Sequence, residues 1–185
     1  MDFMKIRIII LCFCIMLVSK VCLALETTPI CNLGSERLYE NFINECVSIG
    51  VNKNEFSVLM LKRGDRDDRY SFYFPKSNLS LRNHITFIIN SAGYVTLILI
   101  DGSNVTKEST DANLGTIILM LKAIGLTEME VEHAIKHFQK STFTPAGGNG
   151  NLYFSDIYTS AFDRTITIIV HEMPDTHIET FISAE

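Results

Sequence analysis

Two stretches of the chain carry apolar residues at the three- to four-residue spacing of an amphipathic helix, each followed by a glycine. The first covers residues 35–48, where Ser35 can cap the helix and Gly50 ends it. The second covers residues 111–124, and Gly125 ends it. Both segments therefore predict helices with one face packed on a core.

A third helix is expected directly after the second. Thr127 and Glu130 have the spacing of a capping box, and a stripe of apolar residues follows them. The second helix carries more apolar residues than one contact would bury, because Leu119 and Met120 widen its stripe. Burial between the sheet and the third helix is the first explanation. The alternatives are a dimer interface, a partner surface or a hydrophobic ligand cavity.

Six shorter runs have the alternating or continuous apolar pattern of β-strands. They cover residues 56–62, 69–74, 84–90, 94–100, 152–159 and 164–171. Consecutive runs are joined in pairs by short turns of the kind that hairpins use. The order α-β-β-β-β-α-α-β-β predicts an α+β fold, in which an antiparallel sheet of about six strands carries the N-terminal helix and the central helix pair on one face. The residues from Pro174 onward are expected to be loosely held.

The N-terminal residues 1–24 have the organisation of a secretory signal peptide. Lys5 and Arg7 give a basic start, residues 8–18 form an unbroken apolar run, and small residues follow at the exit. The apolar run is shorter than the roughly 20 residues that span a bilayer. We therefore expect residues 1–24 to be removed and residues 25–185 to form one exported domain with no stable membrane span, periplasmic in the first interpretation and secreted in the alternative.

The charge of the expected mature chain is acidic. The full sequence has 16 Lys and Arg against 21 Asp and Glu. Residues 1–24 hold three of the basic and one of the acidic residues, which leaves 13 against 20 and a net charge of −7. Binding to phosphate groups depends mainly on Lys and Arg, so this balance argues against nucleic acid and anionic membranes. It is compatible with a basic protein partner.

Two cysteines, Cys31 and Cys46, remain after residues 1–24 are removed. In an oxidising compartment such a pair favours one disulfide. An unbroken helix would place Cys46 ~16 Å along its axis from Ser35, so the segment before the helix would have to fold back to reach it. Two buried thiols are therefore the alternative.

Two histidines have a spacing that suits a metal ion. His133 and His137 are four residues apart, and a third ligand could come from His171, Glu172 or His177. The helical periodicity places the pair on the solvent side, where nothing orients the rings. We therefore expect no metal site, no cofactor and no assembled catalytic group.

Two loops are the candidate binding surface, because recognition residues concentrate on exposed loops held by a rigid scaffold. One is the charged tip of the first predicted hairpin, and the other is a flexible loop rich in glycine. The candidate residues are Arg63, Asp65, Arg66, Asp67, Asp68, Gly147, Gly148 and Asn149.

These observations favour an exported, non-catalytic domain that binds another protein, such as a periplasmic immunity protein, an inhibitor or an escort protein. The partner would be basic in the simplest case, and a homodimer is a further form of the same hypothesis. The alternative is a carrier of a hydrophobic small molecule or lipid in a cavity between helix and sheet. A metal-dependent enzyme that uses His133 and His137 is the third hypothesis.

Overall fold

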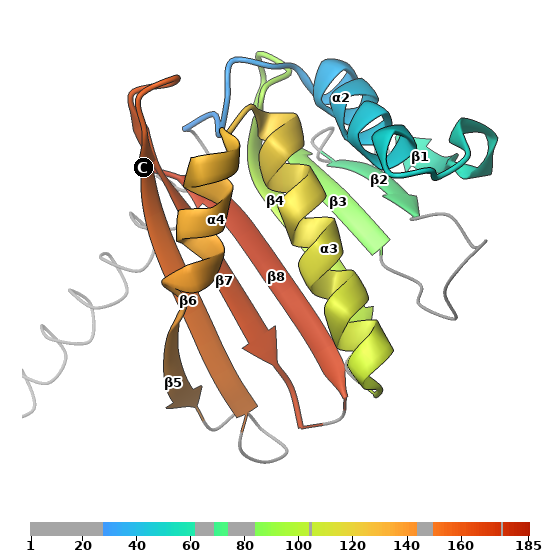
Figure 1. The fold of residues 1–185 in the computed structure, drawn as a ribbon. Helices are drawn as coiled ribbons and strands as arrows, with labels where there is room; N and C mark the ends of the chain where they lie inside the picture. Colours follow the sequence, from blue (N-terminus) through green and yellow to red (C-terminus); the bar gives the residue numbers. More distant parts are fainter. Residues whose placement is uncertain (1–27, 62–68, 74–83, 104, 144–149, 175) are drawn as a thin grey trace, which may run out of the picture.

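The chain folds into two layers, with helices on one face of a sheet (Figure 1). The computed structural model describes residues 28–61, 69–73, 84–103, 105–143, 150–174 and 176–185. Within these residues three α-helices cover an eight-stranded antiparallel sheet. The predicted α+β class and the order of helix, strands, helix pair and strands are confirmed.

The helices are α2 (Ser35–Ser48), α3 (Lys107–Ile124) and α4 (Glu128–Lys136), and a short 3-10 turn, η1 (Lys53–Glu55), follows α2. The strands are β1 (Ser57–Leu61), β2 (Arg69–Tyr73), β3 (His84–Ile89), β4 (Val95–Ser103), β5 (Gln139–Phe143), β6 (Gly150–Thr159), β7 (Arg164–Glu172) and β8 (His177–Ala184). Their order across the sheet is β1-β2-β3-β4-β8-β7-β6-β5.

The C-terminal strand β8 lies in the middle of the sheet, between β4 and β7. The expectation that the residues from Pro174 onward are loosely held is therefore wrong. Ile178, Thr180 and Ile182 alternate along β8 and are buried, because they face the helices. Strand β5 was also not predicted, and it lies at the edge of the sheet beside β6.

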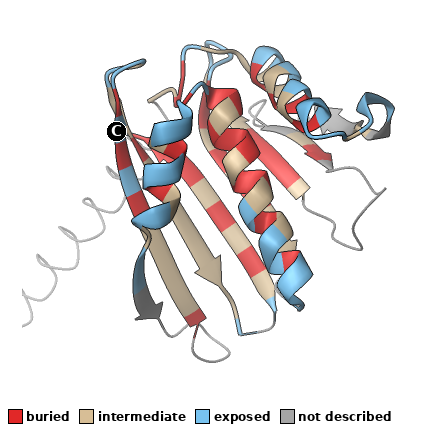
Figure 2. Cartoon of the chain, viewed as in Figure 1, coloured by how far each residue is buried: buried red, intermediate tan, exposed pale blue. Residues whose placement is uncertain are grey.

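The core lies between the sheet and the helices, where Figure 2 shows the buried residues. Phe72 on β2 is fully buried at the centre of an aromatic cluster. Its ring centroid is 4.8 Å from that of Tyr39, 5.7 Å from that of Phe42 and 5.3 Å from that of Phe87. Two of these partners come from α2 and one from β3, so the cluster joins the N-terminal helix to the sheet.

The starts and ends of the central helices follow local chemistry. Helix α3 begins one turn before the predicted residue 111, because Thr106 and Ser109 form a capping box there. It ends at Gly125, which has φ 111° and so adopts a conformation that other residues rarely enter. The N-cap of α2 is Gly34 and not the predicted Ser35, which is the first helical residue.

The predicted capping box of α4 is confirmed. The Thr127 hydroxyl accepts a hydrogen bond from the Glu130 backbone N–H, and the Glu130 carboxylate accepts one from the Thr127 backbone N–H at 2.7 Å. Partial burial raises the pKa of Glu130, but hydrogen bonds from Thr127 and Thr159 together hold this pKa below its ordinary value. The carboxylate therefore stabilises the fold above the pKa that it has in the unfolded chain, and this stabilisation is lost as the pH falls through its folded pKa.

Removal of this cap is expected to have a measurable, pH-dependent cost. Thr127→Ala should lower the free energy of unfolding by about 1 kcal/mol at neutral pH, because the N-terminal donors of α4 lose their partners. The difference should shrink under acidic conditions, as the pH falls through the lowered pKa of Glu130 and its carboxylate takes up a proton. Urea unfolding followed by circular dichroism measures both values. An equal cost at both pH values would contradict the assigned role of Glu130.

Candidate functional site

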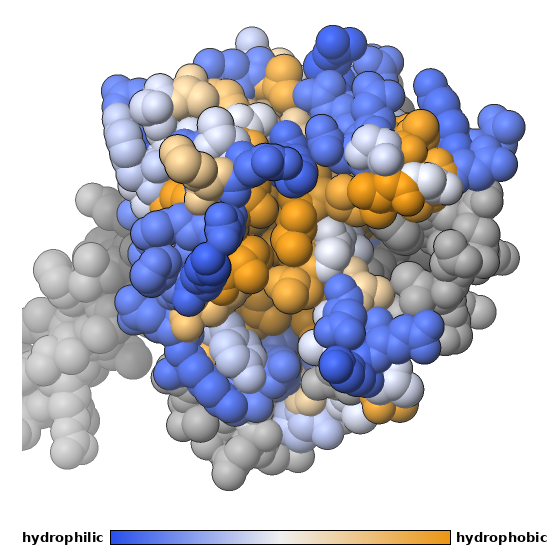
Figure 3. Space-filling model, viewed as in Figure 1, coloured by the Kyte–Doolittle hydropathy of each residue, from blue (hydrophilic) through white to orange (hydrophobic). Residues whose placement is uncertain are grey.

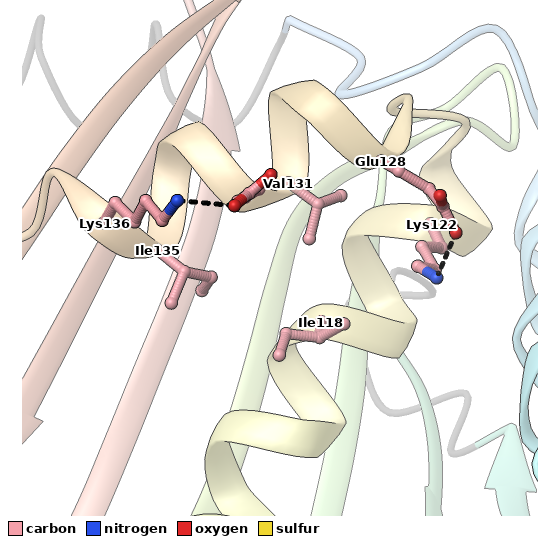
Figure 4. A pocket seen from close by; sticks show the side chains of 7 residues that line it. Ile118, Lys122, Glu128, Val131, Ile135 and Lys136 are labelled. Atoms are coloured by element: carbon pink, nitrogen blue, oxygen red, sulfur yellow. Dashed lines mark hydrogen bonds and ion pairs between the residues drawn. The ribbon is translucent and has the colours of Figure 1, made fainter.

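An open groove lies between α3 and α4 (Figure 4). Its volume is about 390 Å³. Both helices contribute to its walls, and the lining residues are Ile118, Lys122, Glu128, Val131, Glu132, Ile135 and Lys136. The groove is therefore built from two helices that are adjacent in the sequence.

The short connection between α3 and α4 explains the groove. Gly125 ends α3 and Thr127 caps α4, so the chain reverses within a few residues and the two helices diverge from this turn (Figure 1). Ile118 and Ile135 are only partly buried, and their side chains point into the space between the helices (Figure 4). This space has an apolar floor.

Charged residues line the rim of the groove. Lys122 Nζ lies 3.3 Å from Glu128 Oε1, and Lys136 Nζ forms a second ion pair with Glu132. Hydrogen bonding and the positive charge of Lys136 hold the pKa of Glu132 below its ordinary value. Exposed ion pairs of this kind contribute little to stability, so these four side chains can exchange their partners. In Figure 3 the hydrophobic hollow is flanked by hydrophilic side chains on both sides.

The apolar surplus of α3 is mostly explained by burial. Leu119 and Met120, which widened the predicted stripe, are buried together with Ile117 and Leu121. Ile118 is the part of this surface that remains accessible in the groove. The sequence indicated that α3 has more apolar surface than one contact needs, but it did not locate the groove.

The two predicted loop surfaces lie outside the described residues. Neither the hairpin tip, residues 63–68, nor the loop, residues 147–149, is described by the structure. Their role in binding therefore stays a prediction.

Cys31 and Cys46 are both buried and both free. The structure does not contain the expected disulfide. It agrees with the alternative, in which both cysteines are buried thiols. The segment before α2 does not fold back along this helix, because Ile30 donates a backbone hydrogen bond to Val95 and Gly34 forms a bridge with Tyr94. This segment instead follows the start of β4.

Burial also determines the reactivity of both thiols. Burial raises the pKa of the Cys31 thiol, against the opposing effects of a backbone hydrogen bond and Arg164. Burial, with the nearby Glu45 carboxylate, raises the pKa of Cys46 to about 12. Because the thiolate is the reactive form, both cysteines should be inert in the folded protein.

A thiol-labelling experiment tests this assignment. We expect the chain without residues 1–24 to show no reactive thiol at neutral pH when folded and two when unfolded in guanidinium. If unfolded, unreduced protein still showed no thiol, the cysteines would form a disulfide and the structural assignment would be wrong.

Among the described residues, the group of side chains placed closely enough to share a metal ion does not include His133 or His137. His133 and His137 are exposed, as the helical periodicity predicted, and their ring centroids are 4.2 Å apart. Of the suggested third ligands, Glu172 accepts hydrogen bonds from Asn151 and Tyr153. His177 lies close to carboxylates on its own strand and on β4.

The structure instead brings His177 together with Asp101 and Glu179, within the described residues. The spacing of His133 and His137 suggested His177 as one possible third ligand for that pair, and the sequence does not indicate the two carboxylates. Asp101 comes from β4, and it reaches β8 only through the register of the sheet. No spacing within the sequence indicates this contact.

No helix among the described residues is long and apolar enough to span a membrane. A scan of the chain against protein-family models finds no match, and a search of curated proteins finds none either.

Proposed function

We propose that the chain is an exported, non-catalytic protein-binding domain and that the groove between α3 and α4 is its binding surface. The observation that carries this proposal is an apolar floor, formed by Ile118, Val131 and Ile135, in an open groove on the surface of the domain. Apolar surface of this kind, bordered by polar residues, is typical of interaction sites.

The shape of the groove favours an extended or helical segment of a partner protein. An amphipathic helix binds such a groove by placing its apolar side chains on the floor and its polar side chains in solvent. The rim offers Lys122 and Lys136 to acidic groups of the partner and Glu128 and Glu132 to basic groups. The groove itself is therefore balanced in charge, and a basic partner would be attracted mainly by the acidic remainder of the domain.

Export rests on the N-terminal sequence, whose segments resemble those of a cleaved signal peptide. A periplasmic immunity, inhibitor or escort protein is the form of this proposal that fits a small acidic exported domain. A secreted protein and a homodimer that pairs through the groove are its alternatives.

A hydrophobic small-molecule or lipid carrier is the second candidate function. The groove volume of about 390 Å³ falls within the range of about 300–1,000 Å³ for small-molecule sites. Such sites enclose most of the ligand surface, whereas this groove is open between two helices (Figure 3). We therefore place protein binding first.

Affinity capture with variants of the groove tests the proposal. The tagged chain, the double variant Ile118→Glu/Ile135→Glu and the control Met129→Glu would each be incubated with envelope and secreted fractions of the source organism. Met129 is on α4 but is 80% exposed and does not line the groove. We expect one stoichiometric protein with the wild type and the control and none with the double variant.

Two other outcomes would overturn the assignment. A partner that the double variant retains would place the binding surface elsewhere, and replacement of residues 63–68 and 147–149 would then test the predicted loops. If no protein is captured and organic extraction of the purified protein yields a bound apolar compound, the carrier function is supported instead.

A further inference from the structure

Four titratable side chains meet on the face of the sheet that lies opposite the helices. His84 comes from β3, Asp101 from β4, and His177 and Glu179 from β8. In the strand register His84 faces Asp101, and Asp101 faces Glu179. Their neighbours Ile100 and Ile178 are buried toward the helices, so the alternation of each strand places these four side chains on the other face.

Three of these side chains, those of Asp101, His177 and Glu179, are separated by distances close to those between the ligands of one metal ion. His177 Nε2 lies 3.5 Å from Glu179 Oε1 and 4.0 Å from Asp101 Oδ1. One ligand atom from each residue lies within 4.8 Å of the other two. Ligand atoms about 2.0–2.2 Å from a tetrahedral zinc ion are roughly 3.4 Å apart, so small side-chain rotations would complete the geometry.

His84 contacts the other oxygen of Asp101. Its Nδ1 atom lies 3.4 Å from Asp101 Oδ2, whereas His177 approaches Oδ1. One carboxylate oxygen is therefore oriented by an imidazole while the other faces the cluster. A ligating carboxylate in metal sites is commonly held in this way by a neighbouring hydrogen-bonding group.

Electrostatics also favour a cation at this place. Asp101 and Glu179 are cross-strand neighbours, and like charges directly opposite each other destabilise a sheet. A cation between the two carboxylates removes this repulsion. Strand β7 pairs with β8 on the side away from β4, and there His171 is the register partner of Glu179. The ring of His171 packs against Phe181 at a centroid distance of 5.2 Å.

The cluster is accessible from solvent. The side chains of Asp101, His177 and Glu179 are between 33% and 41% exposed. An ion can therefore enter, and a tetrahedral ion with three protein ligands keeps a fourth position for water or a ligand. The neighbouring strands β4 and β8 pair along their length, so the backbone positions of the ligands are fixed before binding.

We propose that Asp101, His177 and Glu179 bind a divalent transition-metal ion, zinc in the first place, and that His84 orients Asp101 for it. One imidazole nitrogen and two carboxylate oxygens suit Zn²⁺ and related ions. This site lies on a different face from the groove and does not depend on the proposed protein-binding function.

Calorimetric titration with zinc tests the site in purified protein that carries His133→Ala and His137→Ala, which removes the exposed histidine pair. We expect the background protein to bind one zinc equivalent that His177→Ala or Glu179→Gln weakens at least a hundredfold, and that His84→Ala weakens about ten- to hundredfold. Asp156→Asn is the matched control, because Asp156 is an exposed carboxylate on the same face, hydrogen-bonded to Thr167 and outside the cluster. Its zinc affinity should be unchanged.

Thermal unfolding gives a second readout. Zinc at about a hundredfold excess over its Kd should raise the Tm of the background protein by about 5–10 °C and leave that of the His177→Ala form unchanged. Zinc binding that is absent, that survives both His177→Ala and Glu179→Gln, or that requires His133 and His137 would overturn the proposal.

Discussion

Deletion of residues 177–185 is expected to unfold the protein. These residues contain β8, which pairs with β4 on one side and with β7 on the other. Without β8 the sheet separates into a β1–β4 half and a β5–β7 half, and two edges lose their backbone hydrogen-bond partners. Circular dichroism should show no cooperative thermal transition in the truncated chain.

Single substitutions in β8 give a graded form of the same prediction. Ile182 is fully buried in a row with Ile98 and Ile168. Ile182→Ala should lower the free energy of unfolding by about 2–5 kcal/mol, and Ile182→Val by about 0.5–1.5 kcal/mol. Glu185→Gln, at an exposed position next to the strand, is the control and should have little effect. A truncated protein with the wild-type Tm would contradict the central position of β8.

The difficulty of predicting β8 has a physical cause. Of its two pairing partners, β7 is adjacent in the sequence, but β4 lies more than 70 residues earlier in the chain, so no local pattern shows that the strand is central. Polar and charged residues such as His177 and Glu179 alternate with its buried residues, and Pro174 precedes it. In the sequence alone, this composition resembles that of a loosely held terminal segment. The strand can be recognised only when the sheet that buries one face of it is known.

The helix boundaries were predictable because they depend on neighbouring residues. The capping box of Thr127 and Glu130 and the glycine that ends α3 are visible within a few positions of the sequence. The helical spacing also predicted correctly that His133 and His137 share an exposed side.

The sites depend on contacts that local patterns do not contain. The groove requires the angle at which α4 leaves α3, although the apolar surplus of α3 indicated that this helix has an additional contact surface. The cluster of Asp101, His177 and Glu179 requires the register between β4 and β8. Residues from separate strands become neighbours only when the sheet forms.

A charged side chain introduced on the apolar floor of the groove is expected to have the largest effect on binding of the partner protein. Ile118→Glu and Ile135→Glu would each place a carboxylate on the apolar floor, where the partner would have to bury it without a counter-charge. Buried central residues of interfaces contribute about 2 kcal/mol or more when altered, which corresponds to roughly 30-fold in affinity. Both residues are only partly buried, so the variants should keep the wild-type circular dichroism spectrum.

The most direct test of the proposed function is the affinity of the captured partner, measured by calorimetric titration with the wild type, Ile118→Glu/Ile135→Glu and Met129→Glu. The groove account predicts wild-type affinity for Met129→Glu and a loss of about a hundredfold or more for the double variant. Equal affinity of all three folded proteins for the partner would show that the groove between α3 and α4 is not the binding surface.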